Sequence, residues 1–120
     1  MAEDPEMRRE VGLVAGALTK YAGRQGWKDS EYWIYYWPNP DWNKVHFVFV
    51  SEHFDEQDPY KATSEVWAFL KQELNEAPDI LRSLGLVVRS KKKVDEGGLY
   101  AIGPSYREFW TFYPVQAQET

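Results

Sequence analysis

The side chains best suited to metal or acid–base chemistry are the two histidines, His46 and His53, and the acidic segment around His53. That segment, residues 52–58, reads Glu-His-Phe-Asp-Glu-Gln-Asp and holds four carboxylates. Oxygen-rich loops can bind a divalent cation. This one lacks the Asp-x-Asp-x-Asp-Gly spacing of a calcium loop, and Asp58 is expected to cap a helix. We predict a solvated acidic loop and no metal site, with cation binding by His53 and these carboxylates left open.

No residue pattern identifies a reaction. The chain has no cysteine, which excludes disulfides, thiolate metal sites and a cysteine nucleophile. The serines lie in no Gly-x-Ser-x-Gly turn, and no glycine-rich phosphate loop is present. His46 alternates with Val48 and Val50 along a predicted strand, so it is expected to pack in or beside the core. We therefore favour a protein that is not an enzyme, with catalysis left open, and expect no cofactor.

Composition and charge narrow the class of protein further. Hydrophobic residues make up 43% and charged residues 28% of the 120 residues, as in ordinary globular domains. A net charge of −5 disfavours general nucleic-acid binding, which needs a basic surface. Residues 1–10 contain no apolar signal region, and no apolar run approaches the roughly 20 residues that span a bilayer. We expect a cytoplasmic protein without membrane contact.

Three helices are predicted from local signals. Asp4 and Asp58 can cap two of them, each followed by proline at the first helical position. A short third helix is expected over residues 78–84. Gly12 and Gly16 lie inside the first helix, which suggests close packing against a sheet. The apolar residues recur every three or four positions, at Met7, Val11, Val14, Leu18 and Tyr21 in the first helix and at Ala62, Val66, Phe69, Leu70 and Leu74 in the second.

The remaining segments predict strands. Residues 31–37 and 45–51 are read as an antiparallel hairpin joined by a loop over 38–43. Residues 86–90 and 99–102 are read as a second pair around a polar turn over 91–98, and residues 106–113 as a last strand. The predicted fold class is therefore α+β: a single domain over residues 1–120, with a frayed tail at 115–120. Its sheet is expected to be antiparallel, of about five strands, with helices packed on it, in the order α-β-β-α-α-β-β-β.

Aromatic residues on both faces of the first strand lead to the main functional hypothesis. Trp33, Tyr35 and Trp37 alternate with Tyr32, Ile34 and Tyr36, so neither face of the strand is polar. Helices could divide between the faces, the chain could dimerise through the sheet, or one face could bind a partner. The leading hypothesis is a protein-binding domain that uses Trp33, Tyr35, Trp37 and the loop residue Trp42, with the acidic segment 52–58 steering a basic partner.

Residues 80–102 resemble the end of a winged-helix domain. In that family a helix ending in Leu-Gly-Leu-Val, as at 84–87 here, leads into a hairpin with a basic tip. The resemblance covers about a fifth of the chain and implies phosphate contacts by Arg89, Lys91, Lys92 and Lys93. The helix before it offers only Arg82 to read bases, where several polar side chains are usual. Nucleic-acid binding is therefore a second hypothesis, and a small ligand held between helix and sheet is a third.

Overall fold

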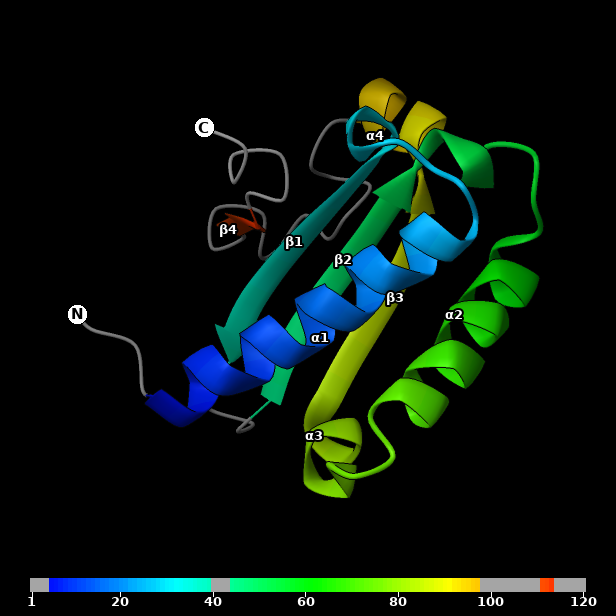
Figure 1. Cartoon of the computed structure of the whole chain (residues 1–120). Helices are drawn as coiled ribbons and strands as arrows, with labels where there is room; N and C mark the ends of the chain where they lie inside the picture. The colour runs from blue at the N-terminus through cyan, green and yellow to red at the C-terminus, as the bar shows by residue number, and fades with distance from the viewer. Residues whose placement is uncertain (1–4, 40–43, 98–110, 114–120) are drawn as a thin grey trace.

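The computed structural model describes residues 5–39, 44–97 and 111–113 (Figure 1). Its order of helices and strands is α-β-β-α-α-β-α-β, with two short 3-10 helices, η1 and η2, in the connections. The elements are α1 (Pro5–Arg24), η1 (Asp29–Glu31), β1 (Tyr32–Asn39), β2 (Lys44–Ser51), η2 (Glu52–Phe54), α2 (Pro59–Glu73), α3 (Pro78–Ser83), β3 (Leu84–Ser90), α4 (Lys91–Gly97) and β4 (Thr111–Tyr113).

The sheet has three long strands in the order β3-β2-β1, and the short β4 pairs with the outer side of β1. β1 and β2 form the predicted antiparallel hairpin, with Tyr32 opposite Ser51 and Asn39 opposite Lys44. Because both strands reach further than expected, Pro38 and Asn39 belong to β1 rather than to the loop. β2 and β3 run parallel, with Val45 opposite Leu84.

The predicted antiparallel sheet of about five strands is therefore wrong, and the sheet is mixed. Parallel strands need a connection of a dozen or more residues, and residues 52–83 supply one through η2, α2 and α3. The nearly unbroken apolar run at 45–50 fits this position, because a central strand next to a parallel neighbour is buried on both faces. Val45, Phe47 and Phe49 face one side and Val48 and Val50 the other, all buried.

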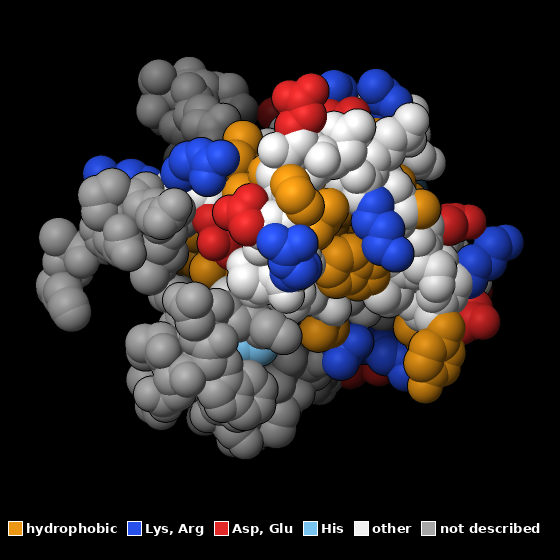
Figure 2. All heavy atoms as spheres, turned by 90° about the horizontal axis from the view of Figure 1, so that it is seen from below, with side chains coloured by type: hydrophobic (Ala, Val, Ile, Leu, Met, Phe, Trp, Pro, Cys, Tyr) orange, Lys and Arg blue, Asp and Glu red, His pale blue; other side chains and the backbone are white. Residues whose placement is uncertain are grey.

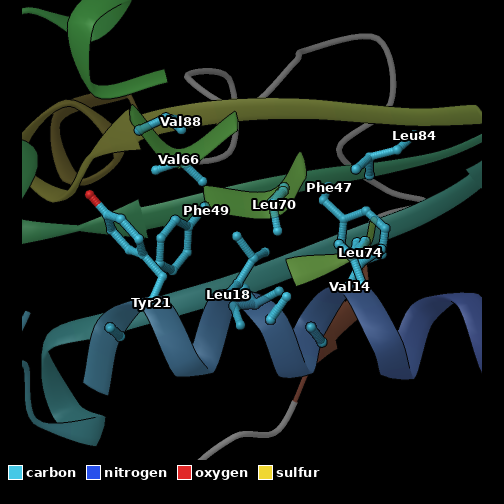
Figure 3. Packing of buried hydrophobic residues seen from close by; sticks show 14 of the residues in the cluster. Val14, Leu18, Tyr21, Phe47, Phe49, Val66, Leu70, Leu74, Leu84 and Val88 are labelled. Carbon is cyan, nitrogen blue, oxygen red and sulfur yellow. The ribbon is translucent and has the colours of Figure 1, made fainter. Parts of the chain in front are cut away.

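α1 and α2 cover one face of the sheet side by side (Figure 1). Val14 and Leu18 of α1 meet Phe47 and Phe49 of β2, and Leu70 of α2 packs against the same layer (Figure 3). The predicted apolar stripes lie in or against this core at Val11, Val14, Leu18 and Tyr21 of α1 and at Ala62, Val66, Phe69, Leu70 and Leu74 of α2. Asp58 caps α2 as expected, because its Oδ1 accepts the Tyr60 N–H at 3.0 Å. Gly26 adopts a φ of 79° just beyond α1, which explains why the helix ends there.

The opposite face of the sheet carries a smaller apolar cluster under α4. Val48 and Val50 are buried there, with Trp33, Tyr35, Val87 and Val94 packed against them. Val94 comes from α4, which contacts β2, β3 and η2. Helices thus lie on both faces, one of the arrangements left open by the doubled aromatic pattern of residues 31–37, which do form a strand.

α4 replaces the turn that was predicted over residues 91–98. Two backbone N–H groups in the first turn of α4 are capped by side chains. Ser90 Oγ accepts the Lys93 N–H at 3.1 Å, and Asp55 Oδ1 accepts the Lys92 N–H at 3.0 Å. Lys91 also bonds to Asp95 one turn later. Because capping of these N–H groups favours a helix, β3 leads into α4 and not into the tip of a hairpin.

Other predictions have mixed outcomes. Gly12 and Gly16 lie on the exposed side of α1, and a Cβ at either position would meet nothing within 4 Å, so they do not serve close packing. Trp42, the strand over 99–102 and the tail at 115–120 lie outside the described residues. Of the predicted strand over 106–113, residues 111–113 are described and form β4. No helix among the described segments has the length and apolar character needed to cross a membrane.

Candidate functional site

A partly enclosed crevice of about 230 Å³ lies where the two parallel strands end. The chain leaves β2 through η2 toward α2 on one face and leaves β3 toward α4 on the other. Connections that diverge to opposite faces open a space beyond the carboxyl ends of parallel strands, where α/β sheets commonly bind ligands. The lining residues are Phe54, Asp55, Gln57, Pro59, Ala62, Val88, Arg89, Ser90 and Lys93.

The crevice combines an apolar floor with a polar rim. Phe54, Ala62 and Val88 are all at most 4% exposed, so their apolar atoms belong to the core below it. Arg89 is half-buried, and its Nη1 donates to the Val88 carbonyl at 3.2 Å. Lys93, also in the lining, is exposed. Apolar floors with a few convergent polar groups are typical of small-molecule sites.

Trp33 lies beside a second, shallower hollow on the α4 side of the sheet. The Lys91 ammonium stands 5.0 Å from the centre of the Trp33 ring, a cation–π contact. Besides these two residues, the hollow of about 490 Å³ is lined by Glu52, Asp55, Lys92, Asp95 and Glu96. The lining has four carboxylates and two lysines, so its net charge is negative, and Trp33 is the aromatic side chain in it.

Tyr35 and Trp37 are half-buried rather than bare. Tyr35 packs on the Val48 and Val50 cluster. Burial raises the pKa of Tyr35, with Lys91 opposing and Asp95 adding to the effect. Trp37 stacks on His46, with the ring centres 5.4 Å apart and the planes 17° from parallel. His46 therefore packs against a neighbouring strand, as its alternation with Val48 and Val50 predicts. Because Trp33, Tyr35 and Trp37 are all partly buried, they do not form one open aromatic surface.

The basic residues of the winged-helix hypothesis do not form a hairpin tip. Arg89 lies in β3, and Lys91, Lys92 and Lys93 form the first turn of α4. Lys91 is engaged by Asp95 and Trp33, and the backbone of Lys92 is bonded to Asp55. The hairpin tip implied by the resemblance at residues 80–102 is therefore replaced by a helix, and phosphate contacts by Arg89, Lys91, Lys92 and Lys93 stay a prediction.

His53 joins a cluster that contains one residue from outside the acidic loop. Its Nε2 lies 3.0 Å from Glu31 Oε1, and its ring stacks on Trp27 at 4.8 Å. Glu31 also accepts the Lys28 N–H, and these bonds lower the pKa of its carboxyl group, the His53 bond most. Ligand atoms of Glu31, Glu52 and His53 lie within 4.8 Å of one another. Because Glu31 and His53 already bond to each other, the cluster joins η1 to η2.

A third hollow of about 620 Å³ lies on the outer side of α2 and α3. Ser64, Trp67, Ala68, Lys71 and Leu81 line it, and it is open to solvent. Figure 2, seen from the end where α3 lies, shows apolar side chains gathered between lysines and arginines. With one charged side chain and no enclosed space, this groove is less suited to a small ligand than the crevice.

Sequence patterns assign Arg89 and Lys93 to nucleic-acid binding and Asp55, within the segment 52–58, to cation binding or to steering a basic partner. They do not bring these residues together in one site with Val88 and Ala62. The residues that build the crevice come from three separate parts of the sequence, 54–62, 88–90 and 93. The parallel pairing of β2 and β3 brings them together. A βαβ interpretation of residues 45–90 would have placed 51–58 and 90–93 at one edge of the sheet.

Comparison with protein-family models, curated proteins and solved structures found no match to this chain.

Proposed function

We propose that this protein is a small-ligand-binding domain whose site is the crevice at the ends of β2 and β3. The observation that carries the proposal is a partly enclosed space with a buried apolar floor and charged groups at its rim. It corresponds to the third hypothesis from the sequence, a pocket between helix and sheet. The absence of cysteine keeps the cytoplasm the expected compartment.

The volume of the crevice limits the size of a first probe, and that size limits the affinity to expect. A crevice of about 230 Å³ lies below the usual 300–1,000 Å³ of ligand sites, so fragments are appropriate probes. At roughly 0.3 kcal/mol per non-hydrogen atom, a ten-atom fragment gains about 3 kcal/mol, which corresponds to a Kd in the millimolar range. Screening therefore has to reach millimolar concentrations.

The test is a fragment screen by thermal denaturation, followed by NMR mapping of the binders. A fragment at ten times its Kd stabilises the folded state by about 1.4 kcal/mol, which raises Tm by several degrees in a domain of this size. We expect binders to perturb the amides of residues 54–62 and 88–93.

The blocking variant is Gln57→Trp, which places a large ring at the rim of the crevice. Its matched control is Gln72→Trp, at an exposed position of α2 outside the described hollows. Gln57→Trp should abolish the shift and Gln72→Trp should keep it. Binders that map elsewhere, or that bind the blocked variant unchanged, would refute the crevice as the site.

A second candidate function is protein binding at the hollow beside Trp33. The observation in its favour is an aromatic side chain surrounded by an excess of carboxylates, which suits a basic peptide segment. This retains the leading hypothesis from the sequence in a narrower form, centred on Trp33 and residues 52–55 rather than on the whole aromatic face.

The corresponding test measures binding of a labelled lysine- and arginine-rich peptide by fluorescence anisotropy. Trp33→Ala should weaken binding at least tenfold, while Trp67→Ala, a change at another half-buried tryptophan, should leave it unchanged. Equal losses in both variants, or equal binding of a glutamate-rich peptide, would contradict a specific basic-peptide site.

A further inference from the structure

We propose that the crevice binds a small organic anion, with its carboxylate or phosphate group beside Arg89 and Lys93 and its apolar part against Phe54 and Val88. The inference rests on the proposed ligand-binding function and names the class of ligand.

The charge of the lining is opposite to that of the whole chain. Arg89 and Lys93 contribute two positive charges and Asp55 one negative charge, so the lining sums to +1, whereas the chain carries −5. Among the described lining residues Asp55 is the one acid, and one of its oxygens, Oδ1, is engaged by α4 because it accepts the Lys92 N–H. An anion in the crevice therefore meets a local excess of positive charge.

The position of Arg89 increases the effect of its charge. Its side chain is half-buried beside Val88, which is 1% exposed. Charges near buried apolar surface are screened less by water and salt than exposed ones. A guanidinium remains protonated at physiological pH and can bond a carboxylate or phosphate through two parallel N–H groups.

The start of α2 adds a weaker contribution of the same sign. Pro59 and Ala62 line the crevice from the first turn of a 15-residue helix. The N-terminal end of such a helix carries a partial positive charge. Asp58 offsets part of it as the cap, so Arg89 and Lys93 remain the main source of selectivity.

The apolar floor requires that the anion also has a hydrophobic part. Phe54 and Val88 are 4% and 1% exposed, and they face a space that an inorganic ion would leave largely empty. A ring or short chain would cover these side chains while its charged end remains at the rim. The ligand is therefore amphipathic, as benzoate and phenyl phosphate are.

The test compares probes of nearly equal shape and different charge by NMR titration at low salt. The set is benzoate, phenyl phosphate, neutral benzamide and cationic benzylamine. We expect both anions to bind the parent protein at least tenfold more tightly than benzamide, and benzylamine not to bind. The ratio of benzoate to phenyl phosphate affinity distinguishes a carboxylate from a phosphate ligand.

Variants then assign the preference to its source. Arg89→Gln should lower the affinity for benzoate at least tenfold and leave that for benzamide unchanged, while Arg89→Lys should retain most of the preference. Lys71→Gln, which removes a cation outside the crevice, should change neither affinity.

The outcomes separate the two proposals. If benzamide binds in the crevice as tightly as benzoate, the anion inference is wrong and the ligand-binding function stands. If no probe of the set binds, or if binding persists in Gln57→Trp, both are wrong. If Arg89→Gln fails to fold, two measurements still test the anion inference. One is the comparison of the four probes on the parent protein. The other is the loss of benzoate affinity in Lys93→Gln, a variant that should fold because Lys93 is exposed.

Discussion

Ser51 shows how a single polar side chain organises the region next to the crevice. It is fully buried at the end of β2, yet its hydroxyl donates to the Glu31 carbonyl at 2.8 Å and accepts the His53 N–H at 3.0 Å. Buried hydroxyls are tolerated when such bonds replace water. Together with the Glu31–His53 pair, these bonds join η1 to η2, the element that provides Phe54.

The Glu31 carboxylate predicts a pH dependence of stability. Its pKa in the folded protein lies below 4.5, the value for the unstructured chain, first because of the hydrogen bond from His53. Its contribution is therefore fully present above about 4.5 and is lost as the pH falls through the lower folded pKa. The Tm difference between the parent and Glu31→Gln should be larger at pH 7 than at pH 3, as measured by circular dichroism.

Glu76→Gln is the matched control, because Glu76 is an exposed carboxylate outside the Glu31–His53 pair. Its Tm difference from the parent should not change over the same pH range. If the Tm difference between the parent and Glu31→Gln stays constant or grows toward pH 3, the bond from His53 does not stabilise the ionised Glu31 carboxylate.

At the scale of elements, Gly16 and Gly85 differ in how much space the neighbouring elements leave for a side chain. Gly16 is exposed in the middle of α1 with open space around it. Gly85 lies in β3 opposite His46, and a Cβ there would approach His46 Nδ1 to 2.7 Å. Because that ring is stacked on Trp37, it has little room to move aside.

Alanine at these two positions should have opposite effects on the free energy of unfolding. Gly16→Ala should raise it by about 0.5–1 kcal/mol, because alanine is the better helix former and meets no obstacle. Gly85→Ala should lower it by about 1–3 kcal/mol through overpacking against His46. Urea denaturation measures both; a neutral or stabilising Gly85→Ala would mean that the ring shifts at little cost.

α4 depends on a bond from a distant part of the chain, which leads to a further prediction. Removing the Asp55 carboxylate with Asp55→Ala takes away the acceptor of the Lys92 N–H, and loss of such a cap costs about 1 kcal/mol. Amide hydrogen exchange over residues 91–97 should become faster than in the parent. Glu56→Ala, at an exposed neighbouring position, should leave this exchange unchanged, and equal protection in both variants would exclude the capping role.

At the scale of the whole molecule, the pairing of β2 with β3 is the feature that determines the site. The parallel register places Val48 beside Val87, two residues that share the apolar cluster under α4. The predicted antiparallel sheet paired residues 86–90 with 99–102 and gave no pairing between residues 45–51 and 86–90.

The absence of cysteine allows a direct test of this register. The double variant Val48→Cys/Val87→Cys should form an intramolecular disulfide on mild oxidation, because directly paired strand residues lie within the range that a disulfide can bridge. Val48→Cys/Arg89→Cys, two positions out of register, should remain reduced. Mass spectrometry after thiol labelling distinguishes the two states, and the reverse pattern would contradict the parallel pairing.

Residue patterns predicted the elements whose signals are local. α1 and α2 were located by a proline start and a three-to-four spacing, and the hairpin of β1 and β2 by its β-forming residues. Pro38 was wrongly assigned to the loop because it sits near the end of β1. The local signs of α4 are the Ser90 hydroxyl and the pair of Lys91 with Asp95 one turn later, but the lysines and glycines of 91–98 favoured a polar turn.

The sequence by itself determined an α+β chain with two amphipathic helices and an aromatic strand that is apolar on both faces. These properties follow from side chains a few residues apart. Only the tertiary structure decided the partner of β3, the capping of α4 from Asp55 and the crevice between them. The physical reason is distance along the chain: Asp55 and Lys92 are 37 positions apart, and local propensities do not encode a bond that exists only after β2 and β3 have paired.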